Sequence, residues 1–163
     1  MPHTILVVDD DESVRTWLET ALKQAGYTVL GAASGSIAVQ LCAQFEGPIH
    51  LIIVDVVLRS ISGPDVVKYG LSMRPEMKAL FISGHSREIL VEHGLPEGVP
   101  FLAKPFVFKE LEAQMLELLR SSTPESGRLA EESAGHERSG SLFSRLHARR
   151  TAGPARRTDE DAP

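Results

Sequence analysis

Several features that would narrow the class of this protein are scarce or missing in its sequence. Cys42 is the only cysteine, so no disulfide can form within the chain, and we expect a reducing, cytoplasmic setting. No apolar run approaches the roughly 20 residues of a membrane-spanning helix. The first residues, MPHTILVV, lack the basic region of a secretion signal. We therefore expect neither membrane insertion nor export.

An excess of positive charge is also lacking, and so are clusters of histidines. The formal net charge is −5, which argues against general binding to nucleic acid, and we predict no nucleic-acid partner. The six histidines show no metal-ligand spacing, so we assign no metal to them. Cys42 has no visible catalytic partner and is better explained as an apolar residue on a helix face.

Large apolar residues become rare after residue 120. Residues 121–163 are rich in Ser, Gly, Pro, Ala and Arg, and such a segment cannot offset its ordering entropy by burial. We predict a folded domain over residues 1–120 and a disordered tail over residues 121–163. Within the tail, SLFSRLHARR could present a small apolar patch to a partner or a membrane surface, but an unstructured segment is the simpler interpretation.

The first 120 residues alternate between two hydrophobic patterns. Short runs rich in β-branched and aromatic residues are apolar on both faces, which is typical of parallel strands covered on both sides. Segments with helical spacing separate them: Gly26 is placed to end the first, Ser34 or Ser36 can cap the second, and Pro64 fits the first turn of the third. The pattern predicts an α/β fold, a doubly wound five-stranded parallel sheet in the flavodoxin-like order 2-1-3-4-5 with helices on both faces. The predicted strands are residues 4–9, 27–32, 50–55, 78–83 and 99–103.

Polar residues follow the ends of these strands. Asp9 and Asp10 end the first strand and Asp55 the third, while Ser83 ends the fourth and Lys104 follows the fifth. Ligands of open α/β sheets bind beyond the carboxyl ends of the strands, so these side chains should converge at one edge. Packed carboxylates repel one another, and burial strengthens the repulsion. Three of them form a hard oxygen site suited to Mg²⁺, which would cancel that repulsion.

The neighbouring polar and aromatic residues have simpler interpretations. Asp11 and Glu12 are helix-start residues favoured by the helix dipole. Trp17, farther along the same helix, is expected to serve helix packing. An acidic pair at a helix start is common, so the signal becomes specific only with the residues that end the other strands.

The segments VVDDDE, IIVDVVLRSISG, FISGHS and FLAKPF together resemble the motifs of the receiver domain of two-component response regulators, a match that covers roughly residues 4–120. The resemblance implies that Asp55 is the phosphoacceptor, which takes a phosphoryl group from a histidine kinase or phosphotransfer protein with Mg²⁺ as cofactor. It implies that Asp10 and Asp55 bind the metal directly, with Asp9 acting through a water and Val57 through its backbone carbonyl.

The same resemblance implies a conformational switch. Lys104 would neutralise charge on the phosphoryl oxygens, and the Lys104-Pro105 peptide bond would be cis. The Ser83 hydroxyl would bond to a phosphoryl oxygen, and its movement would free space for Phe101 to turn inward. The face formed by residues 86–120 would then bind an unknown downstream protein.

Three residues near the phosphoacceptor are expected to tune the reaction. Arg59 stands four residues after Asp55, where the family usually has proline, so the loop is expected to be less rigid. Val57 and His85 occupy positions that adjust loss of the phosphoryl group in the family. An apolar Val57 offers no side chain to orient attacking water, so we predict a long-lived phosphorylated state.

Other functions stay open at this point. A Mg²⁺-dependent phosphohydrolase would need a second acid two residues after its nucleophile, where Val57 stands. A binder of flavin phosphate would need a neutral loop in place of DDDE, and a never-phosphorylated receiver would not keep every catalytic position filled. Because no further domain follows residue 120 and Met1 lies just before the first strand, we predict a complete, stand-alone receiver. It would not be an enzyme, although it would assist its own phosphorylation and dephosphorylation. A phosphate-relay intermediate or a piece of a hybrid kinase is the alternative.

Overall fold

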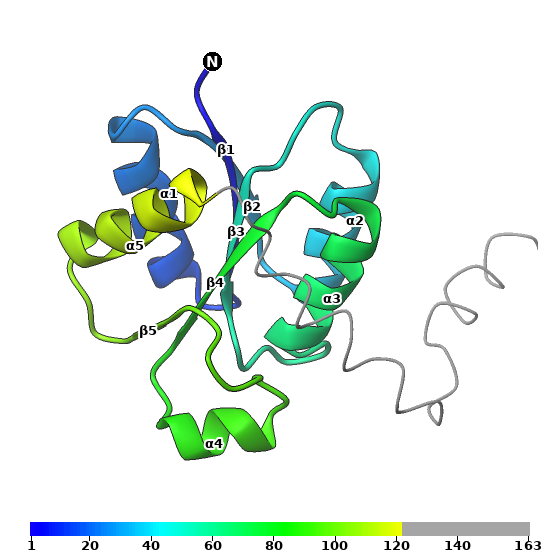
Figure 1. Ribbon diagram of the computed structural model, residues 1–163, viewed down its shortest axis with the longest axis vertical. Helices are drawn as coiled ribbons and strands as arrows, with labels where there is room; N and C mark the ends of the chain where they lie inside the picture. The colour runs from blue at the N-terminus through cyan, green and yellow to red at the C-terminus, as the bar shows by residue number, and fades with distance from the viewer. Residues whose placement is uncertain (122–163) are drawn as a thin grey trace, which may run out of the picture. The chain divides into compact units, whose positions relative to one another are not determined.

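The computed structural model describes residues 1–121, in which five strands alternate with five helices. All neighbouring strands pair in parallel, and the sheet has the order β2-β1-β3-β4-β5 (Figure 1). This order confirms the predicted doubly wound α/β fold. The elements are β1 (Thr4–Val8), α1 (Glu12–Gln24), β2 (Thr28–Ala32), α2 (Gly35–Gln44), β3 (Leu51–Asp55), α3 (Gly63–Met73), β4 (Lys78–Ser83), α4 (Arg87–Glu92), β5 (Phe101–Ala103) and α5 (Phe108–Arg120).

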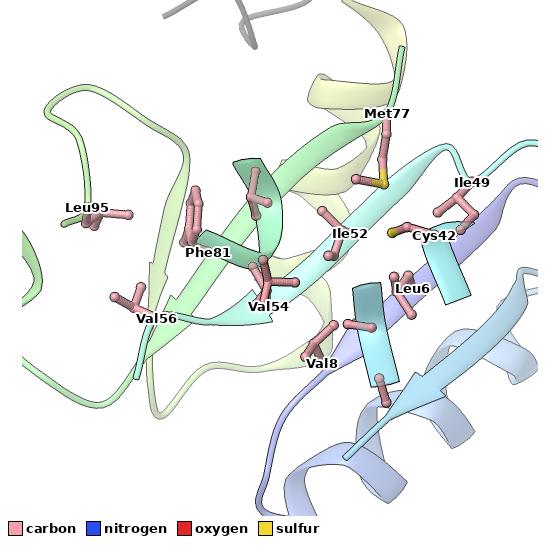
Figure 2. Packing of buried hydrophobic residues seen from close by; sticks show 14 of the residues in the cluster. Leu6, Val8, Cys42, Ile49, Ile52, Val54, Val56, Met77, Phe81 and Leu95 are labelled. Carbon is pink, nitrogen blue, oxygen red and sulfur yellow. The ribbon is translucent and has the colours of Figure 1, made fainter. Parts of the chain in front are cut away.

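Helices cover both faces of the sheet, so each face has its own apolar core (Figure 1). On one face, buried side chains of α1 and α5 pack against those of the sheet, and we call this the α1–α5 core. On the other face, side chains of α2, α3 and α4 form the α2–α4 core. Figure 2 shows the α2–α4 core, in which Cys42 lies beside Leu6 and Ile49. Cys42 is buried in this core, as expected for an apolar residue of a helix face, and burial raises the pKa of its thiol.

The central strands β1 and β3 are buried along their whole length, whereas the edge strand β2 is partly exposed. The fifth apolar run is shortened most: β5 begins at Phe101 and not at residue 99. Pro100 explains this, because it has no N–H to donate to the sheet, although its carbonyl accepts a hydrogen bond from Phe81 N.

Capping residues fix where the helices begin and end beside the sheet edge. The Asp11 carboxylate accepts hydrogen bonds from Ser13 N and Val14 N, so Asp11 is the N-cap of α1. Ser34, one of the two predicted candidates, caps α2. Gly26 follows α1 with a φ of 92°, a conformation that favours glycine and ends the helix.

Trp17 differs from its expected role in helix packing, because the residue stays 44% exposed. The buried stripe of α1 is formed by Leu18 and Leu22, four residues apart, so Trp17 lies beside that stripe. Its ring packs against Phe106 with the centroids 5.9 Å apart. Trp17 therefore covers the loop after β5 and contributes little to the core.

Gly63 ties the loop after β3 to the end of that strand. Its N–H donates a hydrogen bond to the Val56 carbonyl at 2.9 Å. A Cβ at this position would overlap the Asp55 carbonyl oxygen and lie 2.9 Å from Val56 Cα. Only glycine allows this approach, so the loop over residues 56–62 is held against the sheet edge.

The predicted tail falls outside the described residues from position 122 onward, and the domain boundary near residue 120 stays a prediction. Within residues 1–121, no helix has both the length and the apolar character needed to cross a lipid bilayer.

Candidate functional site

The Lys104 ammonium joins two carboxylates at the carboxyl edge of the sheet. Its Nζ lies 2.9 Å from Asp9 Oδ2 and 2.7 Å from Asp55 Oδ2. Asp9 follows β1 and Asp55 ends the neighbouring strand β3, while Lys104 follows β5 and reaches past β4. Lys104 N donates a hydrogen bond to the Ser83 carbonyl at 2.8 Å, which fixes the base of the lysine at this edge. The Lys104-Pro105 peptide bond is cis.

Backbone N–H groups hold the remaining oxygens of both acids. Asp11 N donates to Asp9 Oδ1 and Val57 N donates to Asp55 Oδ1, each at 2.9 Å. Asp9 and Asp55 are buried, with side chains 1% and 11% exposed. Each carboxylate therefore accepts a hydrogen bond from the backbone on one oxygen and from Lys104 on the other, so both buried acids are hydrogen-bonded.

Burial and pairing act in opposite directions on the protons of this cluster. Burial raises the pKa of the Asp9 carboxyl, although the hydrogen bonds from Lys104 and Asp11 N oppose it. Burial alone would lower the pKa of the Lys104 ammonium, but its hydrogen bonds to Asp55 and Asp9 outweigh burial and raise it. The positive charge of Lys104 is therefore secured, whereas the negative charge of Asp9 is costly to keep.

Asp10 lies apart from this inner cluster and pairs with a different cation. Its Oδ2 is 3.1 Å from Arg59 Nε, and its side chain is 26% exposed, against 85% for Arg59. The pair borders an open cleft of about 420 Å³ that is also lined by Arg15 and the N-terminus of α2. Arg15 donates a hydrogen bond to the Asp9 carbonyl at 2.9 Å. Asp10 is thus the solvent-facing acid of the site.

Ser83 and Phe101 lie on one face of the sheet, the face of the α2–α4 core. The register of β4 and β5 pairs Phe81 with Phe101 and Ser83 with Ala103, so the side chains of these four residues point the same way. Ser83 is fully buried, and its Oγ is 3.2 Å from both the Nδ1 and the backbone N of His85. Phe101 is half-buried beneath the Arg87 guanidinium, which lies 6.0 Å from the ring centroid.

The donor set of this edge suits a hard cation, because Asp9, Asp10 and Asp55 offer only carboxylate oxygens. Protein cations now occupy those oxygens: Lys104 on the inner pair and Arg59 on Asp10. Among residues 1–121, no group of three His, Cys, Asp or Glu side chains is arranged closely enough to hold a metal ion. The carboxylates fit Mg²⁺ chemically, and one oxygen of Asp10 is in contact with Arg59.

Of the residues predicted from the sequence, Asp9, Asp55 and Lys104 lie together in the structure. Ser83 lies beside His85, and Phe101 lies on β5, the strand next to that of Ser83. Val57 is half-buried and contributes its backbone N–H to Asp55. Two contacts were not expected. Arg15 binds the Asp9 carbonyl, and Arg59 binds Asp10. The positive charge of Arg59 was the only sign in the sequence that it could pair with an acid, since the spacing does not indicate which acid so long a side chain reaches.

Comparison with known proteins gives one consistent result. The family model described as "Response regulator receiver domain" matches residues 5–116. Response regulator MprA from Mycolicibacterium vanbaalenii is 36% identical over 128 residues, which cover 78% of this chain and 54% of that protein. Sensor kinase CckA from Brucella abortus is 33% identical over 118 residues, 71% of this chain and 12% of that protein. The chain thus spans about half or less of the length of these curated relatives.

A solved structure agrees with the sequence matches. The crystal structure of a response regulator receiver protein from Sinorhizobium medicae superposes with a TM-score of 0.65 at 26% sequence identity. The superposition covers 74% of this chain and 96% of that one.

Proposed function

The chain belongs to the response regulator receiver domain family of two-component systems, and from this premise we propose that it is a phosphoacceptor switch. Asp55 accepts a phosphoryl group from a histidine kinase or a phosphotransfer protein. The observation that supports this most directly is the Lys104 ammonium, shared at 2.9 Å and 2.7 Å between Asp9 and Asp55. Its positive charge lies beside the carboxylate that would become an acyl phosphate.

The residues of the site divide the work of phosphoryl transfer between them. One carboxylate oxygen of Asp55 attacks phosphorus while the phosphorus–nitrogen bond of the donor histidine breaks, and the departing imidazole nitrogen takes up a proton. Lys104, already hydrogen-bonded to Asp55, neutralises charge on the transferred group. Val57 N holds the second Asp55 oxygen and so orients the nucleophile.

Asp10 and Asp55 would hold Mg²⁺ directly, with Asp9 acting through a water and the Val57 carbonyl as a further ligand. When bound, Mg²⁺ supplies the additional positive charge that the transferred phosphoryl group requires. The protein's own part is to keep these oxygens at the edge of the sheet, which it does through the backbone hydrogen bonds to Asp9 and Asp55.

The response to phosphorylation passes through Ser83 and Phe101. The Ser83 hydroxyl leaves His85 and bonds to a phosphoryl oxygen, which frees space for Phe101 on the same face of the sheet. Burial of the phenyl ring is favoured by the hydrophobic effect. The equilibrium between outward and inward Phe101 then shifts, and the surface formed by residues 86–120 changes for a downstream protein.

Val57, Arg59 and His85 set how long the phosphoryl group lasts. Val57 carries no polar side-chain atom to orient a water, and His85 is turned to Ser83. We propose a slowly hydrolysed phosphorylated state on this basis, with the domain assisting its own reactions and turning over no other substrate. A relay intermediate or a hybrid-kinase receiver uses the same chemistry, and the likeness to a sensor kinase keeps that alternative in place.

The experiment that tests the proposal is phosphorylation by acetyl phosphate with Mg²⁺, followed by intact-mass analysis. We expect one phosphoryl group on the wild type and none on Asp55→Asn. Asp65→Asn is the matched control, because Asp65 bonds to Ser62 at the start of α3 and lies outside the site. A phosphorylated Asp55→Asn protein, or an unmodified wild type, would overturn the assignment.

A further inference from the structure

The Arg59–Asp10 ion pair differs in kind from the inner cluster. Asp9 and Asp55 are buried and share a half-buried lysine, whereas the Arg59 side chain is 85% exposed. So exposed a side chain has little packing to hold it in place, so its position depends mainly on the 3.1 Å contact between its Nε and Asp10 Oδ2. The guanidinium therefore exchanges readily for another cation.

Arg59 also stands at the open side of the site. Asp10, Arg59 and Ser60 line the same open cleft, so a cation that reaches Asp10 from solution through this cleft passes the guanidinium. The loop that carries Arg59 is held against the sheet by Gly63, whose N–H bonds to the Val56 carbonyl. This anchoring keeps the guanidinium within reach of Asp10 and gives it a high local concentration.

We propose that Arg59 is an internal competitor of Mg²⁺ for the Asp10 carboxylate, so that metal binding must displace its guanidinium. The inference rests on the proposed function, because it takes Asp10 as a metal ligand. Arg59 then weakens the affinity of the site for Mg²⁺, and its side chain extends into solvent when the metal binds. Its contact with Asp10 also explains how an acid that faces a metal site stays neutralised in the metal-free protein.

The size of the effect follows from the exposure of the pair. Exposed ion pairs contribute little, so removal of Arg59 should tighten Mg²⁺ binding by about two- to fivefold. Loss of one positive charge anywhere on the protein acts in the same direction, more weakly at a distance. Lys68→Gln is the matched control, because Lys68 is an exposed residue of α3 outside the cleft and the substitution changes the net charge equally.

The test is a calorimetric Mg²⁺ titration of the full chain in four forms: wild type, Arg59→Gln, Lys68→Gln and Asp10→Asn. We expect Arg59→Gln to bind Mg²⁺ two- to fivefold more tightly than the wild type, Lys68→Gln to match the wild type, and Asp10→Asn to bind none. A second readout is the Arg59 Nε–H resonance in ¹⁵N-labelled protein. Its chemical shift should change with the same Mg²⁺ midpoint as that of the Asp10 amide. At saturation it should match the chemical shift of Arg59 Nε–H in the Asp10→Asn variant.

The outcomes separate this inference from the function beneath it. Equal affinities of wild type and Arg59→Gln, or equal gains in Arg59→Gln and Lys68→Gln, overturn the competition. An Arg59 Nε–H resonance that ignores Mg²⁺ does the same. In each of those cases the loss of binding in Asp10→Asn leaves the proposed function standing. If neither wild type nor Arg59→Gln binds Mg²⁺ and acetyl phosphate modifies neither, the proposed function fails and the competition fails with it.

Discussion

Replacement of Lys104 by methionine removes the ammonium that pairs with both Asp9 and Asp55, and we expect the folded state to become less stable. The Nζ lies within hydrogen-bond distance of both acids, whose side chains are 1% and 11% exposed. Removing one partner of a buried ion pair costs about 3–5 kcal/mol, because the remaining charge stays uncompensated. Lys104 is itself 22% exposed, so screening by solvent places the expected cost near the lower end, about 3 kcal/mol.

The assay is urea unfolding at pH 7, with Lys109→Met as the control. Lys109 is an exposed residue of α5 outside the site, so its replacement should change the free energy of unfolding by less than about 0.5 kcal/mol. With a stability of about 5–15 kcal/mol for a typical domain, the Lys104→Met variant should remain folded enough to measure.

The pH dependence provides the sharper arm of this test. Burial already raises the pKa of Asp9, and loss of the Lys104 hydrogen bond removes an effect that lowers it. A raised native pKa means that the folded variant binds more protons than the unfolded chain, so the variant gains stability as the pH falls. The deficit relative to the wild type should therefore narrow from pH 7 towards 3.8, the ordinary Asp value. A loss below about 1 kcal/mol at pH 7, or a deficit that ignores pH, would refute the reasoning.

Three further outcomes are expected. Gly63→Ala should lower the free energy of unfolding, measured in urea, by about 2–3 kcal/mol, because the added Cβ would overlap the Asp55 carbonyl. Gly84→Ala is the control: a Cβ there would have no atom within 4 Å, so the free energy of unfolding should change by well under half as much. Deletion of residues 124–163 should leave the rate of phosphorylation by acetyl phosphate unchanged, and a tenfold loss would contradict a domain that ends near residue 120. Beryllofluoride, a phosphate mimic, should change amide exchange within residues 86–120, and changes confined to α1 and α2 would exclude this output face.

The fold could be predicted from the sequence because the strand and helix patterns of hydrophobic residues are local and strong. Strands that are apolar on both faces predict a parallel sheet between helices, and the sheet has the predicted order. The meeting of Asp9, Asp55 and Lys104 could be foreseen for the same reason, since strand ends of a parallel sheet share one edge. The sequence could not predict which groups the ends of long side chains contact. Arg59 could reach several groups, and only the tertiary structure selects Asp10.

Small polar contacts were equally hidden from the sequence. The hydrogen bonds between Ser83 and His85 depend on the turn after β4, and a spacing of two residues does not determine that turn. Helical spacing places Leu18 and Leu22 on the buried stripe of α1, but the contact between the Trp17 and Phe106 rings joins segments far apart in the chain, and no local pattern indicates it. Periodicity determines faces, whereas these contacts depend on individual torsion angles.

The sheet divides the interior into two cores, and this division has a consequence for how the sequence is free to diverge. Ser83 and Phe101 point to the α2–α4 core, and Phe101 packs against it. Under the proposed function, a change of volume there would alter both the stability of the fold and the equilibrium between the two positions of Phe101. The α1–α5 core lies on the opposite face of the sheet and contains neither residue, so substitutions that conserve its volume should leave the space around Ser83 and Phe101 unchanged. The α1–α5 core can therefore diverge in sequence as long as it stays filled, while the α2–α4 core must, under the proposed function, also preserve the balance between two positions of Phe101.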